Sequence, residues 1–164
     1  MFNWEFPSST NKQLINFALV GYYAFIGILL LAIYFYPGST HSDKTTLTYS
    51  LTHNFLSDLG LTIVYSDAQN FISSTLFAFA TTAVCVGLIT YFLVMPSIVN
   101  GGKFSLRLSQ IGSIAGMLCG LAFMGVGFTP YNYYPDEHMF VVKLGFQLFL
   151  AVMLLHSIAI MKNE

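Results

Sequence analysis

Four long runs of apolar residues dominate the chain, and shorter polar segments separate them. The runs cover residues 14–36, 71–95, 106–128 and 140–161. Each is long enough to cross the hydrocarbon core of a bilayer, which takes about 20 residues of α-helix. Pro37, Pro96 and Pro130 follow the first three runs, where proline ends a helix. The pattern predicts an all-α integral membrane protein, an antiparallel bundle of four transmembrane helices in a single domain, residues 1–164.

The composition agrees with lipid as the main solvent. Hydrophobic residues make up 55% of the chain and charged residues only 8%, where a soluble domain usually carries about 25% charged residues. The net charge of −1 gives no basic footprint for nucleic acid, so we expect no nucleic-acid partner. Cys85 and Cys119 lie in apolar runs without metal-binding spacing, so we expect both to be buried hydrophobic residues.

The sparse cations predict the orientation in the membrane. Lys12, Lys103, Arg107 and Lys162 flank the runs on one side, and only Lys44 lies in a connection on the other side. Cytoplasmic segments carry the excess of lysine and arginine. Both termini are therefore expected in the cytoplasm.

This orientation places two polar loops together on the extracytoplasmic side. They are residues 38–70 and 129–137, and the fourth run follows the second loop directly. Most acidic residues and three of the four histidines gather there: His41, Asp43, His53, Asp58, Asp67, Asp136, Glu137 and His138.

The stretch 49–62, YSLTHNFLSDLGLT, is the most unusual part of the first loop. Its leucines and Phe55 predict a short interfacial helix near residues 52–60. We expect Ser57 to shape the turn and Asp58 to reach the fourth helix, where His138 or Lys143 would compensate its charge.

Two polar residues interrupt the fourth run. Lys143 and Gln147 are four residues apart and share one helix face. The Lys143 ammonium either reaches the outer interface along its own stem or occupies a buried functional site. The candidate binding cluster at the mouth of the bundle is thus His53, Ser57, Asp58, His138, Lys143 and Gln147.

Glycines recur every four residues in the third run, at Gly112, Gly116 and Gly120. Such a row lets a neighbouring helix backbone approach closely. It serves either packing within one chain or a dimer seam.

Other chemistries remain open for the polar residues. His53, Asp58 and His138 could bind zinc, which would activate water for hydrolysis, but no compact metal signature is present. Haem ligation would require His138 to pair with a loop histidine. The structural alternative is that these segments begin helices. SDAQNF resembles a capping box that starts at Ser66, and in YPDEH Pro135 suits a first turn.

The segment THNFLSDLG and the end of the third run resemble an uncharacterised family of bacterial and archaeal multi-pass proteins, domain of unknown function nine-nine-eight. The pattern is distantly similar to the damage-regulated autophagy modulator group. The resemblance covers residues 15–160 and implies a prokaryotic cytoplasmic membrane and one shared site for Asp58 and His138. Its members usually have six spans, which implies a short member or two helices that are missing or supplied by a partner. The matching residues are Asn54, Phe55, Ser57, Asp58, Leu59, Gly60, Gly120, Gly127, Phe128, Pro130 and His138.

Taken together, these features favour a protein without enzymatic activity. We expect a membrane subunit or a small protein that binds lipid or another amphiphile, with no cofactor. Membrane lipids, other membrane subunits or further copies of the chain are the expected partners. A metal-dependent hydrolase embedded in the membrane and acting on lipid is the alternative, and a structural subunit of a larger complex is another.

The orientation can be tested by cysteine labelling in intact cells. Ser42→Cys should react with an impermeant thiol reagent added from outside, and Gly102→Cys should react only after the membrane is opened. The opposite labelling pattern would invert the topology.

Overall fold

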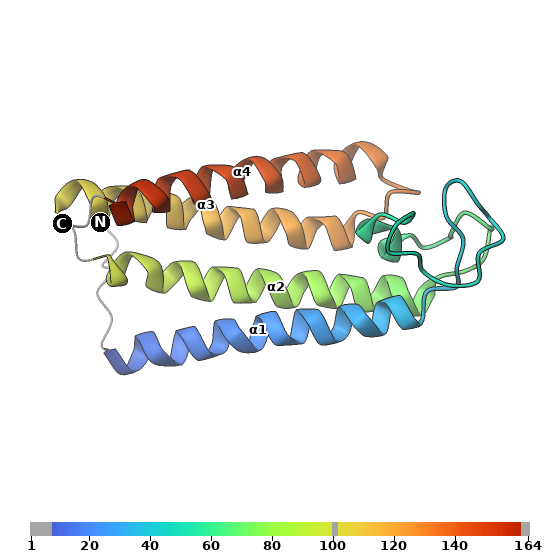
Figure 1. The fold of residues 1–164 in the computed structure, drawn as a ribbon, viewed down its shortest axis with the longest axis horizontal. Helices are drawn as coiled ribbons and strands as arrows, with labels where there is room; N and C mark the ends of the chain where they lie inside the picture. Colours follow the sequence, from blue (N-terminus) through green and yellow to red (C-terminus); the bar gives the residue numbers. More distant parts are fainter. Residues whose placement is uncertain (1–7, 100–101, 162–164) are drawn as a thin grey trace.

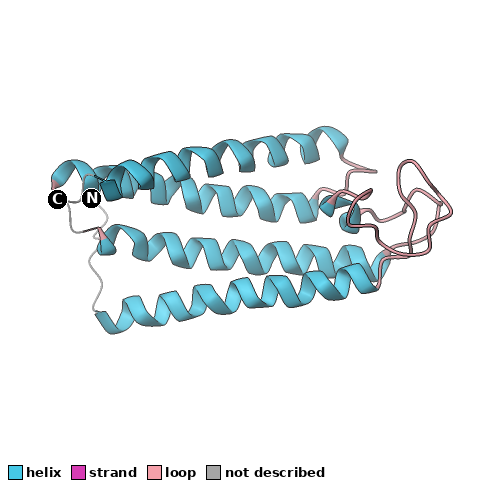
Figure 2. Cartoon of the chain, viewed as in Figure 1, coloured by secondary structure: helices cyan, strands magenta, loops and turns pink. Residues whose placement is uncertain are grey.

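The computed structural model describes residues 8–99 and 102–161 and shows four long helices with their loops gathered mainly at one end (Figures 1 and 2). We call this end, with residues 35–70 and 129–134, the loop end. The prediction of an all-helical four-helix architecture is confirmed. The helices are α1 (Ser8–Tyr34), α2 (Phe71–Ile98), α3 (Lys103–Phe128) and α4 (Pro135–Met161), and a short 3₁₀ helix, η1 (Leu56–Gly60), lies in the first loop.

The observed helix ends agree best with the ends of the apolar runs where a turn-forming segment adjoins the run. α2 begins at Phe71 and α3 ends at Phe128, as expected. The expected stop at Pro96 is wrong, because this proline lies inside the last turn of α2, which ends at Ile98. A proline there removes one backbone hydrogen bond but does not break a helix that is about to end.

α1 and α4 begin earlier than residues 14 and 140, because polar first turns extend a helix beyond its apolar part. In α4 the first turn holds Asp136 and Glu137, which favour the positive end of the helix dipole. Lys162 and both chain ends, which the predicted orientation uses, lie outside the described residues.

The helices pack in chain order, α1 against α2, α2 against α3 and α3 against α4. α1 and α4 lie at the two edges of this open bundle (Figure 1). Large apolar side chains therefore face outward along the edge helices, with Leu30 60% exposed on α1 and Leu154 57% exposed on α4. All four helices are long and apolar enough to cross a membrane, as in a multi-pass integral membrane protein.

The glycine row of α3 serves packing within the chain. A Cβ added at Gly112 would lie 2.6 Å from Cε1 of His156 on α4, and one at Gly116 would overlap the Phe92 ring on α2. At Gly120 the nearest atom is Cβ of Leu88, at 3.2 Å. The row accordingly lies between α2 and α4. Its neighbours at Gly112 and Gly116 are aromatic rings, so the expected close backbone is found only near Gly120, where the carbonyl oxygen of Cys85 is 3.4 Å away.

A close approach of two helix backbones lies instead between α1 and α2. A Cβ at Gly21 would stand 2.9 Å from the carbonyl oxygen of Ala83 and 2.9 Å from Cα of Gly87. Gly27, on the same helix, has nothing within 4 Å. The difference between these two glycines comes only from tertiary packing, because in the sequence each is a single glycine in an apolar stretch.

This contrast gives a matched pair of substitutions on α1. Gly21→Ala should lower stability by about 1–3 kcal/mol, because backbone atoms cannot move aside as a flexible side chain can. Gly27→Ala should be neutral or stabilising, since alanine favours the helix by about 1 kcal/mol over glycine. Thermal unfolding in detergent measures both changes. Equal behaviour of the two variants would contradict the observed α1–α2 contact.

Candidate functional site

The first loop folds back onto the helix ends through η1. The expected interfacial helix near residues 52–60 is present but shorter, and residues 51–53 form a turn. Leu59 is fully buried in a cluster with Ala32, Phe77 and Val126 from three helices. Burial of this leucine draws the loop between the helix ends. The Asn70 side chain then donates to the carbonyl oxygens of Leu59 (3.1 Å) and Leu61 (2.7 Å), so both buried acceptors are satisfied.

Asp58 organises the rest of this loop. Its side chain is 5% exposed. The Oδ2 atom accepts hydrogen bonds from the Asn54 side chain and from the Phe55 backbone N–H, both at 3.0 Å. The Oδ1 atom accepts one from the Tyr65 hydroxyl, also at 3.0 Å. Three donors therefore compensate the buried carboxylate without a cation.

Two tyrosines near Asp58 are held in the protonated state. Burial, followed by the Asp58 charge, raises the pKa of Tyr65 and raises the pKa of Tyr36 to about 12. A tyrosine is protonated at neutral pH even at its ordinary pKa, and the raised pKa extends the range in which the Tyr65 hydroxyl donates to the carboxylate to higher pH. The Tyr36 hydroxyl donates to the carbonyl oxygen of Ser39 at 3.3 Å, and Asn54 donates to the same oxygen at 3.0 Å.

The expected contact between Asp58 and α4 is not made. All hydrogen bonds that the structure gives to the Asp58 carboxylate come from its own loop. His138 is 3% exposed, and its Nδ1–H donates to the carbonyl oxygen of Thr129 at 2.7 Å. Lys143 and Gln147 are exposed on α4. The loop supplies its own donors at short sequence separation, so Asp58 needs no partner from α4.

The remaining cluster residues are also separate. His53 is exposed and its Nδ1 lies 2.8 Å from the Thr52 hydroxyl, while Ser57 is partly buried. Within the described ranges, no group of three histidine, cysteine or acidic side chains is placed to hold a metal. The hypothetical set of His53, Asp58 and His138 therefore does not form a zinc site. His41 packs edge-on against Tyr65, at 5.6 Å between ring centres, and His138 packs against Tyr131, at 5.7 Å.

One local interpretation of the sequence is wrong. Ser66 and Gln69 do not form a capping box, because Asp67 adopts a positive φ of 64° that breaks a helical path. Ile63 and Gln69 instead pair across a turn, and α2 begins only at Phe71. The other interpretation is confirmed, since Pro135 is the first residue of α4.

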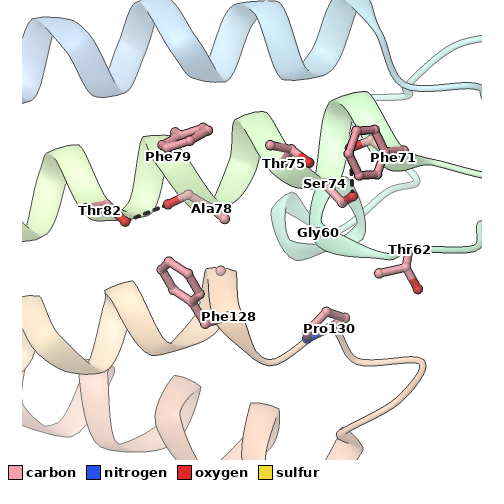
Figure 3. Close-up of a pocket in the computed structure, with 11 residues that line it drawn as sticks. Gly60, Thr62, Phe71, Ser74, Thr75, Ala78, Phe79, Thr82, Phe128 and Pro130 are labelled. Carbon is pink, nitrogen blue, oxygen red and sulfur yellow. Dashed lines mark hydrogen bonds between the residues drawn. The ribbon is translucent and has the colours of Figure 1, made fainter.

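A groove of about 530 Å³ lies between α2 and the end of α3, directly beside η1. Figure 3 shows Phe128 projecting from the end of α3 toward α2, with Phe79 on the other side of the groove. Phe71 lines it close to the loops (Figure 3). These three rings are 60–77% exposed. The walls are mainly apolar, and the groove is open to the surroundings of the helices.

Three hydroxyl groups lie along the α2 side of the groove. The Ser74 hydroxyl donates to the carbonyl oxygen of Asn70 at 2.6 Å, and the Thr82 hydroxyl donates to that of Ala78 at 2.8 Å. The Thr75 hydroxyl makes no hydrogen bond within the described part of the chain. It is therefore the hydroxyl that is available to a bound molecule. Nothing in the sequence distinguishes Thr75 from the neighbouring hydroxyl residues.

A two-point contact closes the loop end of the groove. The Thr62 backbone N–H donates to Oδ1 of Asn132 at 3.1 Å, and Nδ2 of Asn132 donates to the Thr62 hydroxyl at 2.8 Å. This pair joins the first loop to the second, across 70 residues of sequence. The two loops thus meet, as their common side predicts. They meet through amide and hydroxyl groups, and not through the acidic and histidine side chains.

Comparisons with protein-family models, with curated proteins and with solved structures found no match. The resemblance to the family of unknown function stays a prediction.

The Asp58 network predicts a large difference between two loop carboxylates. Asp58→Asn replaces an acceptor oxygen by an amide group that faces existing donors, and it removes the charge that strengthens these bonds. Hydrogen bonds to charged groups contribute about 1.5–3 kcal/mol, so Asp58→Asn should lower stability by an amount of this order. Asp67→Asn is the matched control, because Asp67 is exposed and asparagine tolerates its positive φ. Thermal unfolding and protease cleavage of residues 39–56 measure both variants, and equal loss would refute the organising role of Asp58.

Proposed function

We propose that the protein binds a single-chain segment of a membrane amphiphile, such as a phospholipid acyl chain, in the groove between α2 and α3. The observation that carries this proposal is the form of the groove: apolar, rimmed by three phenylalanines and open beside the helices. Ligand sites typically combine such walls with a few polar groups that set orientation. Here the free Thr75 hydroxyl and the Thr62–Asn132 pair supply the polar groups.

The length of the groove supports an acyl chain as the occupant. Its α2 wall extends from Phe71 to Thr82. Eleven residues of helix correspond to roughly 16 Å at 1.5 Å per residue. One leaflet contributes about half of a hydrocarbon core that is roughly 30 Å thick. A chain lying along this wall would reach from the loop end to near the middle of the bilayer.

The charges at the loop end favour a headgroup without net negative charge. Asp43, Asp67, Asp136 and Glu137 are exposed there, whereas Lys44 is the cation of the described loops. Like charges across a binding surface oppose association. With the cytoplasmic termini that the cation distribution predicts, the lipid would come from the outer leaflet of the cytoplasmic membrane.

The alternative of a metal-dependent lipid hydrolase has no comparable support. The described residues bring no three metal ligands together, and the buried Asp58 carboxylate is fully engaged by loop donors. The groove residues offer hydroxyls and aromatic rings, which suit binding.

Photo-crosslinking with a phospholipid that carries a diazirine in its acyl chain tests the proposal. The full-length protein in vesicles of neutral phospholipid should be labelled mainly along 71–82 and at Phe128, as read by mass spectrometry. Thr75→Trp should reduce this labelling several-fold, because the indole fills the groove. Adding an anionic headgroup to the probe should weaken the labelling.

Val86→Trp provides the matched control. Val86 lies three turns further along the same face of α2, beyond the groove, and is 38% exposed. This variant should keep the parent's labelling at 71–82. Labelling that is spread evenly over all exposed helix faces, including Leu30 on α1, would show only surrounding lipid and would refute a specific site.

A further inference from the structure

The outward face of α4 carries a polar group where a lipid-facing helix should have none. Gln147 is exposed and lies near the midpoint of α4, a 27-residue helix. It makes no hydrogen bond within the described part of the chain. Twelve residues separate it from Pro135, roughly 18 Å at helical rise, so a glutamine side chain cannot reach the headgroup region. An unpaired amide in hydrocarbon costs several kcal/mol.

The other helices do not share this feature at the same depth. Asn16 on α1 is also exposed, but it lies only four residues from Lys12, near the end of the helix. Near the middles of α1, α2 and α3, the exposed side chains of the described residues are apolar or tyrosine, such as Tyr23, Val86 and Leu118. These faces are compatible with lipid as they stand. α4 therefore differs by its polar group, which needs a protein partner.

Gln147 belongs to a stripe that points directly away from α3. The residues of α4 that contact the rest of the chain, including His138, Gly145 and Val152, are buried on the opposite side of the helix. Spacings of three and four residues keep the stripe on one face. All of its members are exposed: Asp136, Phe140, Lys143, Gln147, Leu150, Leu154, Ser157 and Met161. This spacing is the one that two packed helices use as a seam.

We propose that this stripe is the interface between two copies of the chain, packed α4 against α4 around a two-fold axis. Two copies inserted in the same orientation place identical residues at the same depth. A glutamine amide has both a donor and an acceptor, so the two Gln147 side chains satisfy each other. Polar side chains hold membrane helices together in this way.

The two-fold axis brings Lys143 of the two copies to the same depth, so these charges need a compensating acid. Lys143 and Asp136 are two helical turns apart, and Asp136 lies nearer the loop end. The Lys143 stem can direct its ammonium toward that end, where Asp136 of the second copy offers the opposite charge. Lys143 makes no ion pair within the described residues of its own chain. The groove between α2 and α3 stays open in such a dimer, so the test of one proposal does not depend on the outcome of the other.

Cysteine crosslinking of the full-length protein in membranes tests the geometry. Leu154→Cys should form a disulfide-linked dimer under mild oxidation. Met153→Cys should not, although Met153 is 54% exposed, because it lies about 100° from the stripe at one residue's rotation. The parent, whose two cysteines are buried, sets the background. Equal crosslinking of both variants, or none at position 154, overturns the proposal.

The role of the amide is measured by the monomer–dimer equilibrium in vesicles at varying protein-to-lipid ratio. Gln147→Leu should raise the dissociation constant about three- to tenfold, the effect of losing interhelical hydrogen bonds. Met153→Leu, at an exposed position off the stripe, should leave the dissociation constant unchanged. An unchanged equilibrium for Gln147→Leu overturns the proposal, as does a parent that is monomeric or that pairs with a different chain. Leucine on an exposed helix face leaves the fold intact, which a thermal-unfolding measurement verifies.

Discussion

A polar group that lies against lipid or in the interior is costly unless it has a hydrogen-bond partner within protein, and this constraint shapes the loop end of the structure. The four helices meet it by themselves along their backbones. In the loops, side chains supply the missing hydrogen bonds. Asn70 donates to two carbonyl oxygens of the buried loop segment, and three donors surround the Asp58 carboxylate. The fold at the loop end is thus a consequence of hydrogen-bond satisfaction around a few buried apolar anchors.

The same constraint divides the polar residues into two groups. Asp58, Asn70 and His138 are buried and hydrogen-bonded within the loop end, so they serve the structure, although Oδ1 of Asn70 has no partner among the described residues. Thr75 and Gln147 have no hydrogen-bond partner within the described residues. Thr75 lines the groove between α2 and α3, and Gln147 lies on the outward face of α4. Residues of the second kind are the ones that can act on something else. Both functional proposals follow from them, one toward a lipid chain and one toward a second copy of the protein.

The open arrangement of the bundle gives these groups access to the membrane. Because the helices pack in chain order, α4 covers only one side of α3 and its own outer face stays free (Figure 1). A groove also remains beside η1, between α2 and the last residues of α3. A closed bundle with α1 packed against α4 would cover the stripe that carries Gln147.

The sequence by itself determined the four helices, the start of α2 at Phe71, the end of α3 at Phe128 and the common end of the two polar loops. Apolar run length, proline and glycine act locally, so these features need no knowledge of neighbours. Tertiary structure alone decided which polar side chains meet. The sequence spacing placed Lys143 and Gln147 on one face, but only the packing of α4 shows that this face points away from the bundle. Likewise, Asp58 found its donors in Asn54 and Tyr65 rather than on α4, because loop closure around Leu59 fixes the distances that a hydrogen bond requires.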